Sequence, residues 1–143
     1  MPTRTLPTLA ETERLAANLA AIVRTGDAIL LSGDLGAGKT AFARAFLRAL
    51  TGDPALDVPS PTFTLVQTYD SPKGPVHHYD LWRLTDHTAM TELGWDDATD
   101  DIVLVEWPDR LGPLTPKHAL TLTLCPTGED SREATLTGWA DRL

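Results

Sequence analysis

The sequence predicts a small mixed α/β fold in which helices cover a sheet whose central strands are parallel. Two apolar runs, 28–31 and 102–105, are typical of strands buried on both faces, as in a parallel sheet. Helical spacing of apolar residues precedes and follows the first run, and β-prone segments with turn residues between them indicate added antiparallel hairpins. The length of 143 residues predicts a single domain, 1–143, with one core.

A helix is the first element that we expect, beginning near Thr8. The run from Thr8 to Glu11 fits a capping box, in which the hydroxyl and the carboxylate each accept a hydrogen bond from a backbone N–H at the start of a helix. Apolar residues then recur at helical spacing until Gly26, a typical stop signal. A second helix is predicted over 41–50.

The remaining segments predict two hairpins and one short helix. Residues 63–69 and 76–82 are rich in β-branched and aromatic side chains and flank a turn cluster, so we expect them to pair. Residues 119–124 and 133–137 form a second such pair. A short helix is expected around 86–93, before the second buried strand.

Composition restricts the class of protein. A net charge of −8 argues against a surface that binds nucleic acid unaided, because such binding depends on Lys and Arg neutralising phosphates. The single Cys125 excludes an internal disulfide, and no Cys/His spacing suggests zinc. No apolar run approaches the roughly 20 residues of a membrane span, and the N-terminus lacks the apolar core of a signal peptide. We therefore expect no membrane association and a cytoplasmic location.

A phosphate-binding loop is the strongest functional signal. Gly33-Asp34-Leu35-Gly36-Ala37-Gly38-Lys39-Thr40 fits the pattern G-x-x-x-x-G-K-[ST] at every fixed position. Backbone N–H groups of such a loop converge on phosphate oxygens, while Lys39 adds a positive charge and Thr40 a hydroxyl for Mg²⁺. A buried strand before the loop and a helix after it complete an anion site. The fold class is therefore a three-layer α/β P-loop NTPase with a mixed, mostly parallel sheet and added hairpins.

Two acidic residues are candidates for the metal and the attacking water. Glu106 follows four apolar residues, so it should emerge at the edge of the sheet where ligands of open α/β folds bind, and hold Mg²⁺ directly or through water. The alternative is a carboxylate turned to solvent. Asp80 could bind a metal-bound water or orient the attacking water. It could equally pair with Arg83 or face solvent.

Three further polar residues allow weaker inferences. Thr62 lies between Pro61 and a predicted strand, so its hydroxyl could reach the γ-phosphate or Mg²⁺, or simply cap the strand. His77 and His78 are adjacent on a strand and point to opposite faces, so they cannot act as one pair; we expect them to be solvated or structural. No Asn-Lys-x-Asp element of guanine-specific proteins follows the loop, which favours ATP.

The chain resembles the bacterial TsaE family, formerly called YjeE. The resemblance rests on the phosphate loop together with Ser60-Pro61-Thr62-Phe63, His78-Tyr79-Asp80-Leu81-Trp82-Arg83 and Val105-Glu106-Trp107-Pro108, in that order. It spans nearly the whole chain, and the four motifs at these separations are specific where the loop alone is generic. Trp82 stands where the family more often has Tyr.

The resemblance implies a role for individual residues. It implies that Thr40 and Glu106 bind Mg²⁺, and that Lys39, Thr62, Asp80 and Glu106 are catalytic or switch residues. The residues it places at the nucleotide are Leu35, Gly36, Ala37, Gly38, Lys39, Thr40 and Trp107 around the phosphates, and, as weaker transfers, Thr8, Thr12, Ser131 and Arg132 on the adenine side.

The resemblance also implies an activity. Members of this family are small ATPases required for the threonylcarbamoyl modification of adenosine 37 in tRNAs that read codons beginning with A, and they act with the TsaB and TsaD proteins. We therefore expect a Mg²⁺-dependent ATPase, weak alone, whose partners bind the tRNA. A small-molecule kinase, or a nucleotide-sensing module without useful hydrolysis, are the alternatives.

Overall fold

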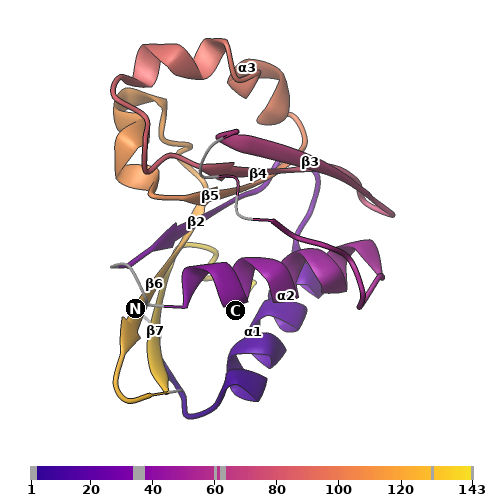
Figure 1. The fold of residues 1–143 in the computed structure, drawn as a ribbon, viewed down its shortest axis with the longest axis vertical. Helices are drawn as coiled ribbons and strands as arrows, with labels where there is room; N and C mark the ends of the chain where they lie inside the picture. The colour runs from indigo at the N-terminus through magenta and orange to yellow at the C-terminus, as the bar shows by residue number, and fades with distance from the viewer. Residues whose placement is uncertain (1–2, 34–37, 60, 62–63, 130, 143) are drawn as a thin grey trace.

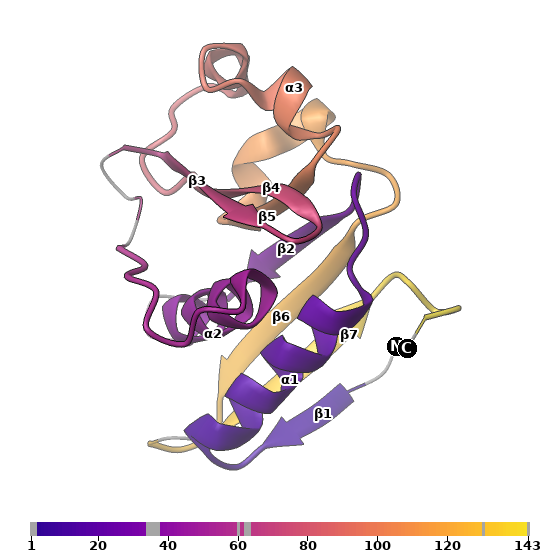
Figure 2. The same ribbon diagram turned by 90° about the vertical axis from the view of Figure 1, so that its right-hand side faces the viewer.

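The computed structural model describes residues 3–33, 38–59, 61, 64–129 and 131–142. Its centre is a seven-stranded sheet with the strand order β1-β7-β6-β2-β5-β4-β3. Strands β2 to β7 are labelled in Figure 1, and β1 is labelled in Figure 2. The strands are β1 (Thr3–Leu6), β2 (Ala28–Ser32), β3 (Val66–Ser71), β4 (Gly74–Asp80), β5 (Ile102–Glu106), β6 (Leu120–Pro126) and β7 (Arg132–Thr137).

The centre of the sheet is parallel and its flanks are antiparallel. Strand β2 pairs in parallel with β5 and β6, and β5 pairs in parallel with β4. The hairpins β3–β4 and β6–β7 then extend the sheet on either side, and β1 adds an antiparallel edge to β7. The predicted mixed α/β fold is confirmed, and each hairpin contributes one strand to the parallel centre.

Helices α1 (Leu9–Ile22) and α2 (Lys39–Thr51) lie together on one face of the sheet (Figure 2). The hydroxyl of Thr8 caps α1 by accepting a hydrogen bond from the backbone N–H of Glu11 at 3.3 Å, which confirms one half of the predicted capping box. The Glu11 carboxylate instead accepts a hydrogen bond from the guanidinium of Arg14 at 2.9 Å. Helix α1 ends at Ile22, earlier than the predicted stop at Gly26. The backbone N–H of Gly26 instead bonds the carbonyl of Asp101 at 3.0 Å, which draws the chain into the turn before β2.

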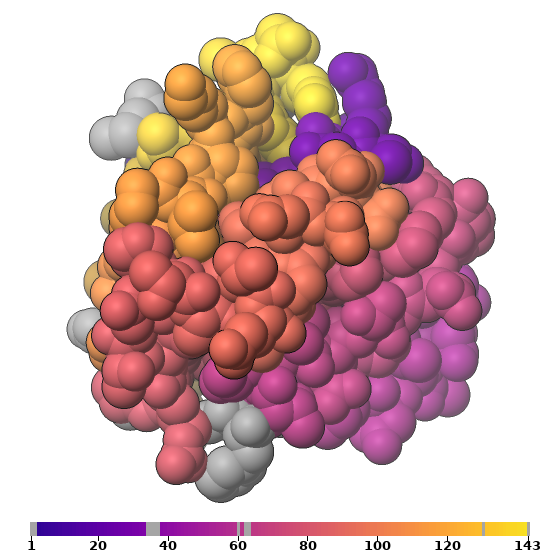
Figure 3. Space-filling model, turned by 90° about the horizontal axis from the view of Figure 1, so that it is seen from above, coloured from indigo at the N-terminus to yellow at the C-terminus, as the bar shows by residue number. Residues whose placement is uncertain are grey.

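Short helices cover the opposite face: η1 (His87–Thr91), α3 (Trp95–Ala98) and η2 (Pro108–Leu114). The predicted helix at 86–93 is the 3-10 helix η1, whereas α3 and η2 were not predicted. The segment with η1 and α3 lies beside the segment with η2 across this face (Figure 3). Burial of Met90, Trp95 and Leu111 holds these segments to the sheet, so packing maintains helices too short to be stable alone.

Two cores fill the spaces on the two faces of the sheet. Alternate residues of β2 and β5 point to opposite sides: Leu31 and Leu104 pack towards α1 and α2, whereas Leu30 and Val105 pack towards the short helices. Because both faces are covered, β2 and β5 are continuously apolar up to their last residues. This explains why both strands could be predicted from their uninterrupted apolar runs.

Strand β1 was missed in the sequence. It is four residues long at the edge of the sheet, and only Leu6 of the four is buried. An edge strand with one buried side chain carries no alternating pattern, so only its pairing with β7 identifies it. Among the described helices, none is long and apolar enough to span a bilayer.

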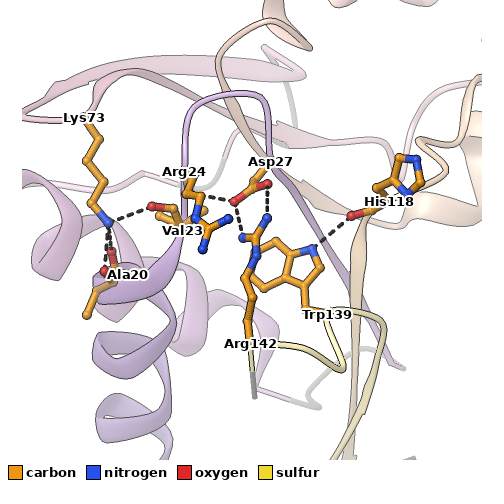
Figure 4. Close-up of polar contacts among 9 residues, drawn as sticks. Ala20, Val23, Arg24, Asp27, Lys73, His118, Trp139 and Arg142 are labelled. Atoms are coloured by element: carbon orange, nitrogen blue, oxygen red, sulfur yellow. Dashed lines mark hydrogen bonds and ion pairs between the residues drawn. The ribbon is translucent and has the colours of Figure 1, made fainter.

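Charged side chains form contacts at the end of the sheet where β2 begins (Figure 4). The guanidinium of Arg142 donates to both oxygens of Asp27, at 2.6 and 3.0 Å. The ammonium of Lys73 donates to three carbonyls at the C-terminal end of α1, at 3.0 Å to Ala20, 3.0 Å to Ala21 and 2.7 Å to the C-cap residue Val23. These contacts join the hairpin β3–β4, helix α1 and the C-terminal segment at the end of the fold far from the carboxyl ends of the parallel strands.

Candidate functional site

The phosphate loop connects the carboxyl end of β2 to the first turn of α2. Gly38, the N-cap residue of α2, has a left-handed backbone with φ of 96°, which favours glycine. The first unpaired N–H groups of a 13-residue helix therefore face the loop, an arrangement that suits phosphate. Thr40 is exposed in this first turn. The predicted contacts Leu35, Gly36 and Ala37 lie outside the described residues.

The side chain of Lys39 is turned back towards Gly33, and the residue is only 5% exposed. Its ammonium nitrogen donates to the carbonyl oxygen of Gly33 and lies 3.5 Å from the centre of the Trp107 ring. Both contacts favour a cation, the first through a carbonyl dipole and the second through the negative face of the aromatic ring. The positive charge is thus held at the mouth of the loop, beside β5.

Trp107 follows the last residue of β5 in a left-handed conformation, with φ of 59° and ψ of 53°. A left-handed conformation is strained for a residue with a side chain, and such strain is concentrated at functional sites. The Trp107 ring packs against Trp82 with 4.4 Å between centroids, and Trp82 is itself 42% exposed. Trp107 therefore links the phosphate loop to an aromatic surface.

The two candidate carboxylates, Asp80 and Glu106, are the last residues of adjacent parallel strands and stand opposite each other in register. Both belong to the sheet face that α2 covers, because their positions alternate with the residues of the other core. They are 4% and 3% exposed, so neither is a solvent-facing carboxylate. The Oδ1 atom of Asp80 accepts a hydrogen bond from the backbone N–H of Trp82 at 3.0 Å.

His78 is a site residue whose partner the sequence did not reveal. Its Nε2 atom lies 2.7 Å from Oε2 of Glu106, and its side chain is 2% exposed. His77 points to the opposite face and bonds Asp101 at 3.0 Å, so the predicted separation of the two imidazoles is confirmed. The sequence did contain one indication of this position. His78 stands two residues before Asp80, and side chains alternate along a strand, so both lie on the same face of β4.

The loop that precedes β3 is tied to the end of β4. The backbone N–H of Asp80 donates to the carbonyl of Leu65 at 3.0 Å, and the N–H of Leu65 donates to the carbonyl of Pro61 at 2.6 Å. Leu65 takes a left-handed φ of 69° to make this turn. Thr62 lies outside the described residues. On its two sides, Leu65 bonds Asp80 directly, and Pro61 bonds Leu65.

A second group of predicted residues meets at the N-terminal ends of α1 and α2. Thr12, Gly38 and Arg132, with Leu9 and Ala41, line a cavity of about 60 Å³. A Cβ added to Gly38 would lie 3.0 Å from Nε of Arg132, so the guanidinium stem rests on the loop itself.

The other two residues predicted on the adenine side have local partners. The hydroxyl of Thr8 caps α1, and Oγ of Ser131 accepts a hydrogen bond from the hydroxyl of Thr127 at 2.9 Å. The structure therefore brings Thr12 and Arg132 to the phosphate loop, and places Thr8 and Ser131 in the turns beside them.

The candidate site brings positive charge and acidic oxygens together at the carboxyl ends of the parallel strands. A helix N-terminus and Lys39 suit phosphate, and two buried carboxylates with a threonine hydroxyl suit Mg²⁺, which favours one or two carboxylates together with substrate phosphates. The donor set is oxygen alone, as a hard cation requires. The described residues of the edge therefore fit a magnesium nucleotide.

A family model and individual relatives that match this chain carry the same name, TsaE. The family model described as threonylcarbamoyl adenosine biosynthesis protein TsaE matches residues 6–134. The tRNA threonylcarbamoyladenosine biosynthesis protein TsaE of Bacillus subtilis is 36% identical over 134 residues, which cover 92% of this chain and 82% of the relative. The protein of the same name from Rickettsia felis is 40% identical over 112 residues, 78% of this chain.

A solved structure shares the fold. The crystal structure of Bacillus subtilis YdiB superimposes with a TM-score of 0.78 at 30% identity, covering 99% of this chain and 87% of that one. The matched segments span 62% of the length of the Rickettsia felis relative and 64% of the Rickettsia conorii relative.

Proposed function

The chain belongs to the TsaE family, whose members take part in tRNA threonylcarbamoyladenosine biosynthesis, and from this premise we propose that it is a Mg²⁺-dependent ATPase serving that modification. The observation that carries the proposal is the register of β4 and β5. It places two buried carboxylates, Asp80 and Glu106, side by side at the sheet edge where the phosphate loop begins. Positive and negative groups for a metal nucleotide thus lie together.

In this proposal Lys39 and the N-terminus of α2 hold the phosphates. Lys39 exchanges the Gly33 carbonyl for phosphate oxygens, since a phosphate is the stronger partner for an ammonium. Thr40 and Glu106 hold Mg²⁺, which when bound neutralises charge that develops on the transferred phosphoryl group. Asp80 orients the attacking water. Its own carboxylate is fixed by the backbone N–H of Trp82 at 3.0 Å.

ATP is the proposed nucleotide, with its adenine near Thr12 and Arg132. Both residues line the cavity against Gly38, within reach of a nucleoside whose phosphates occupy the loop. Thr8 and Ser131 border this region, and the ring of Trp107 contacts the ammonium of Lys39. Leu35, Gly36, Ala37 and Thr62 complete the phosphate side in the proposal.

The proposed partners are the TsaB and TsaD proteins, with tRNA bound through them. A net charge of −8 disfavours direct binding of a phosphate backbone, so other proteins must supply the basic surface. Efficient phosphoryl transfer requires preorganised positive charge around the γ-phosphate. We expect the partners to complete that arrangement and to raise a low intrinsic rate. The proposed location is the cytoplasm.

The decisive experiment is single-turnover release of phosphate from ATP, measured with and without purified TsaB and TsaD. We expect faster release with the partners, and loss of release in D80N and E106Q while ATP binding persists. The matched control is E92Q, which alters an exposed carboxylate at the end of η1. Equal rates with and without partners contradict their role, and unchanged rates in D80N and E106Q contradict the assignments.

The same experiment tests the two alternatives. A small-molecule kinase would transfer the phosphoryl group to an acceptor other than water, so labelled phosphate would appear on that acceptor. A nucleotide-sensing module would bind ATP without releasing phosphate under any of these conditions. Wild-type release of free phosphate separates the ATPase from both.

A further inference from the structure

A buried histidine and a buried carboxylate form a hydrogen-bonded pair at the proposed metal site. Nε2 of His78 lies 2.7 Å from Oε2 of Glu106, and the two side chains are 2% and 3% exposed. We propose that His78 is a positioning residue: by donating to Oε2 it fixes the Glu106 carboxylate, so that Oε1 is presented to the metal. The proposal rests on the proposed function, because it takes Glu106 to be a ligand of Mg²⁺.

The register of the sheet dictates which residue can do this. Position 78 of β4 pairs with Leu104 of β5, and position 80 pairs with Glu106. His78 is therefore diagonal to Glu106 on the same face, at a separation that long side chains span. Asp80, directly opposite Glu106, is a like charge and cannot anchor it. A hydrogen-bond partner for Glu106 on β4 must therefore come from the preceding position on the same face, which His78 occupies.

In each side chain of the pair, one of the two polar atoms makes the hydrogen bond, namely Nε2 of His78 and Oε2 of Glu106. No described residue donates to Oε1 of Glu106, so one carboxylate oxygen is held and the other is available. On the imidazole, Nδ1 is buried without a hydrogen-bond partner among the described residues. An unpaired buried polar atom costs on the order of 1–3 kcal/mol. Packing alone would favour an apolar residue here, so the bond to Glu106 is the contribution that requires histidine.

Fixing the carboxylate has a direct chemical consequence. Metal ligands are commonly held by outer hydrogen-bond partners, and loss of such a partner costs about tenfold to a hundredfold in metal affinity or activity. Without the His78 contact, the Glu106 carboxylate is free to rotate about its terminal torsion and to turn away from the Asp80 carboxylate. Mg²⁺ would then have to order the ligand on binding.

Two substitutions separate positioning from packing. In H78Q the side-chain amide nitrogen occupies about the place of Nε2, so a donor to Glu106 is preserved. In H78N the amide reaches only the place of Nδ1, where no described residue accepts a bond. Both variants are polar and smaller than or similar in size to histidine, so a thermal melt of each controls for loss of the fold.

The measurement is the affinity for a non-hydrolysable ATP analogue with Mg²⁺ and with EDTA. The ratio of the two dissociation constants is the stabilisation of the nucleotide complex by Mg²⁺. We expect H78N to reduce this ratio about tenfold or more, with affinity in EDTA unchanged, and H78Q to restore most of it. The E106Q variant completes a double-mutant cycle. In the E106Q background, H78N should not change the ratio further, because His78 acts through Glu106.

The outcomes distinguish this proposal from the proposed function. An unchanged ratio in H78N, or an equal loss in H78N with and without E106Q, overturns the positioning role. A merely structural histidine would lower affinity in EDTA and Mg²⁺ alike. If the wild type binds the magnesium analogue with the expected cycle yet never releases phosphate from ATP, the ATPase proposal fails and the role of His78 stands.

Discussion

The ammonium nitrogen of Lys39 lies 3.5 Å from the centre of the Trp107 ring, although 68 positions separate the two residues in the chain. The contact joins the first residue of α2 to the residue that follows β5. A left-handed backbone at Trp107, with φ of 59°, turns the chain at this point. The lysine of the phosphate loop and the end of the acidic strand therefore form one structural unit before any ligand binds.

Replacing Lys39 should abolish most nucleotide binding. In K39A the loop loses its buried positive charge, and no other described lysine has a contact with Gly33 or Trp107 that could substitute. We expect a loss of affinity for ATP of about a hundredfold, equivalent to about 2.7 kcal/mol. Isothermal titration against ATP with Mg²⁺ checks this.

The control for that titration is K117A, which removes an exposed lysine. It should bind ATP as the wild type does. Wild-type affinity in K39A would refute the phosphate-loop assignment itself.

Arg132 should contribute to nucleotide affinity more than to stability. Its guanidinium stem lies against Gly38, and a Cβ at Gly38 would come within 3.0 Å of its Nε atom. We expect R132A to weaken ATP binding about tenfold, because a guanidinium that lines the cavity proposed for the adenine is lost. The same variant should weaken binding of inorganic triphosphate less than that of ATP if Arg132 lies on the adenine side.

The matched control for R132A is R14A, because the side chain of Arg14 is 67% exposed and forms an ion pair with Glu11 on the surface of α1. Its ATP affinity should equal that of the wild type. An equal loss in the two arginine variants would mean that net charge, rather than position, controls binding.

The ion pair Asp27–Arg142 should stabilise the fold more than the exposed pair Glu11–Arg14 does. Both side chains are largely buried, at 11% and 17% exposed, and the guanidinium donates to both carboxylate oxygens, which raises the pKa of Arg142. We expect D27N and R142A each to lower the free energy of unfolding by about 1.5–3 kcal/mol. Urea denaturation of both single variants and the double variant measures their coupling.

The exposed pair Glu11–Arg14 provides the comparison for this measurement. Exposed ion pairs contribute about 0.2–1 kcal/mol, so R14A should have a far smaller effect on unfolding than R142A. A coupling between Asp27 and Arg142 no larger than that between Glu11 and Arg14 would contradict the assignment.

Stability should fall at alkaline pH through Tyr79. Burial raises the pKa of its hydroxyl from 10.0 to about 12, and the hydroxyl donates to the carbonyl of Leu93 at 2.9 Å. As pH rises through 10, the unfolded chain releases this proton first, so unfolding becomes progressively more favourable until pH 12. At neutral pH, Y79F should cost about 1 kcal/mol from the lost hydrogen bond.

The difference between the wild type and Y79F isolates this titration. The free energy of unfolding of both proteins is measured from pH 8 to about pH 12, and the advantage of the wild type should shrink above pH 10. Tyr69, whose pKa is raised by burial and then by Asp57, is present in both proteins and cancels. A constant difference across this range would show that Tyr79 does not titrate as stated.

Local pattern was sufficient for most elements and for several site residues. The predicted hairpin 119–124 with 133–137 corresponds to β6 and β7, and the apolar run 102–105 to β5. These segments were predictable because burial on one or both faces imposes a period on nearby residues. The 3-10 helix η2 and α3 escaped prediction because their stability comes from contacts with distant strands.

The sequence by itself determined the phosphate loop, since Gly38, Lys39 and the helix that follows are neighbours in the chain, and it determined that Glu106 ends a buried strand. Only the tertiary structure decided what Glu106 touches. Its partner His78 is 28 residues away and meets it because β4 and β5 pair in parallel at one particular register. A shift of one residue would turn His78 to the other face, because side chains alternate along a strand. The contact therefore depends on long-range pairing that no local pattern encodes.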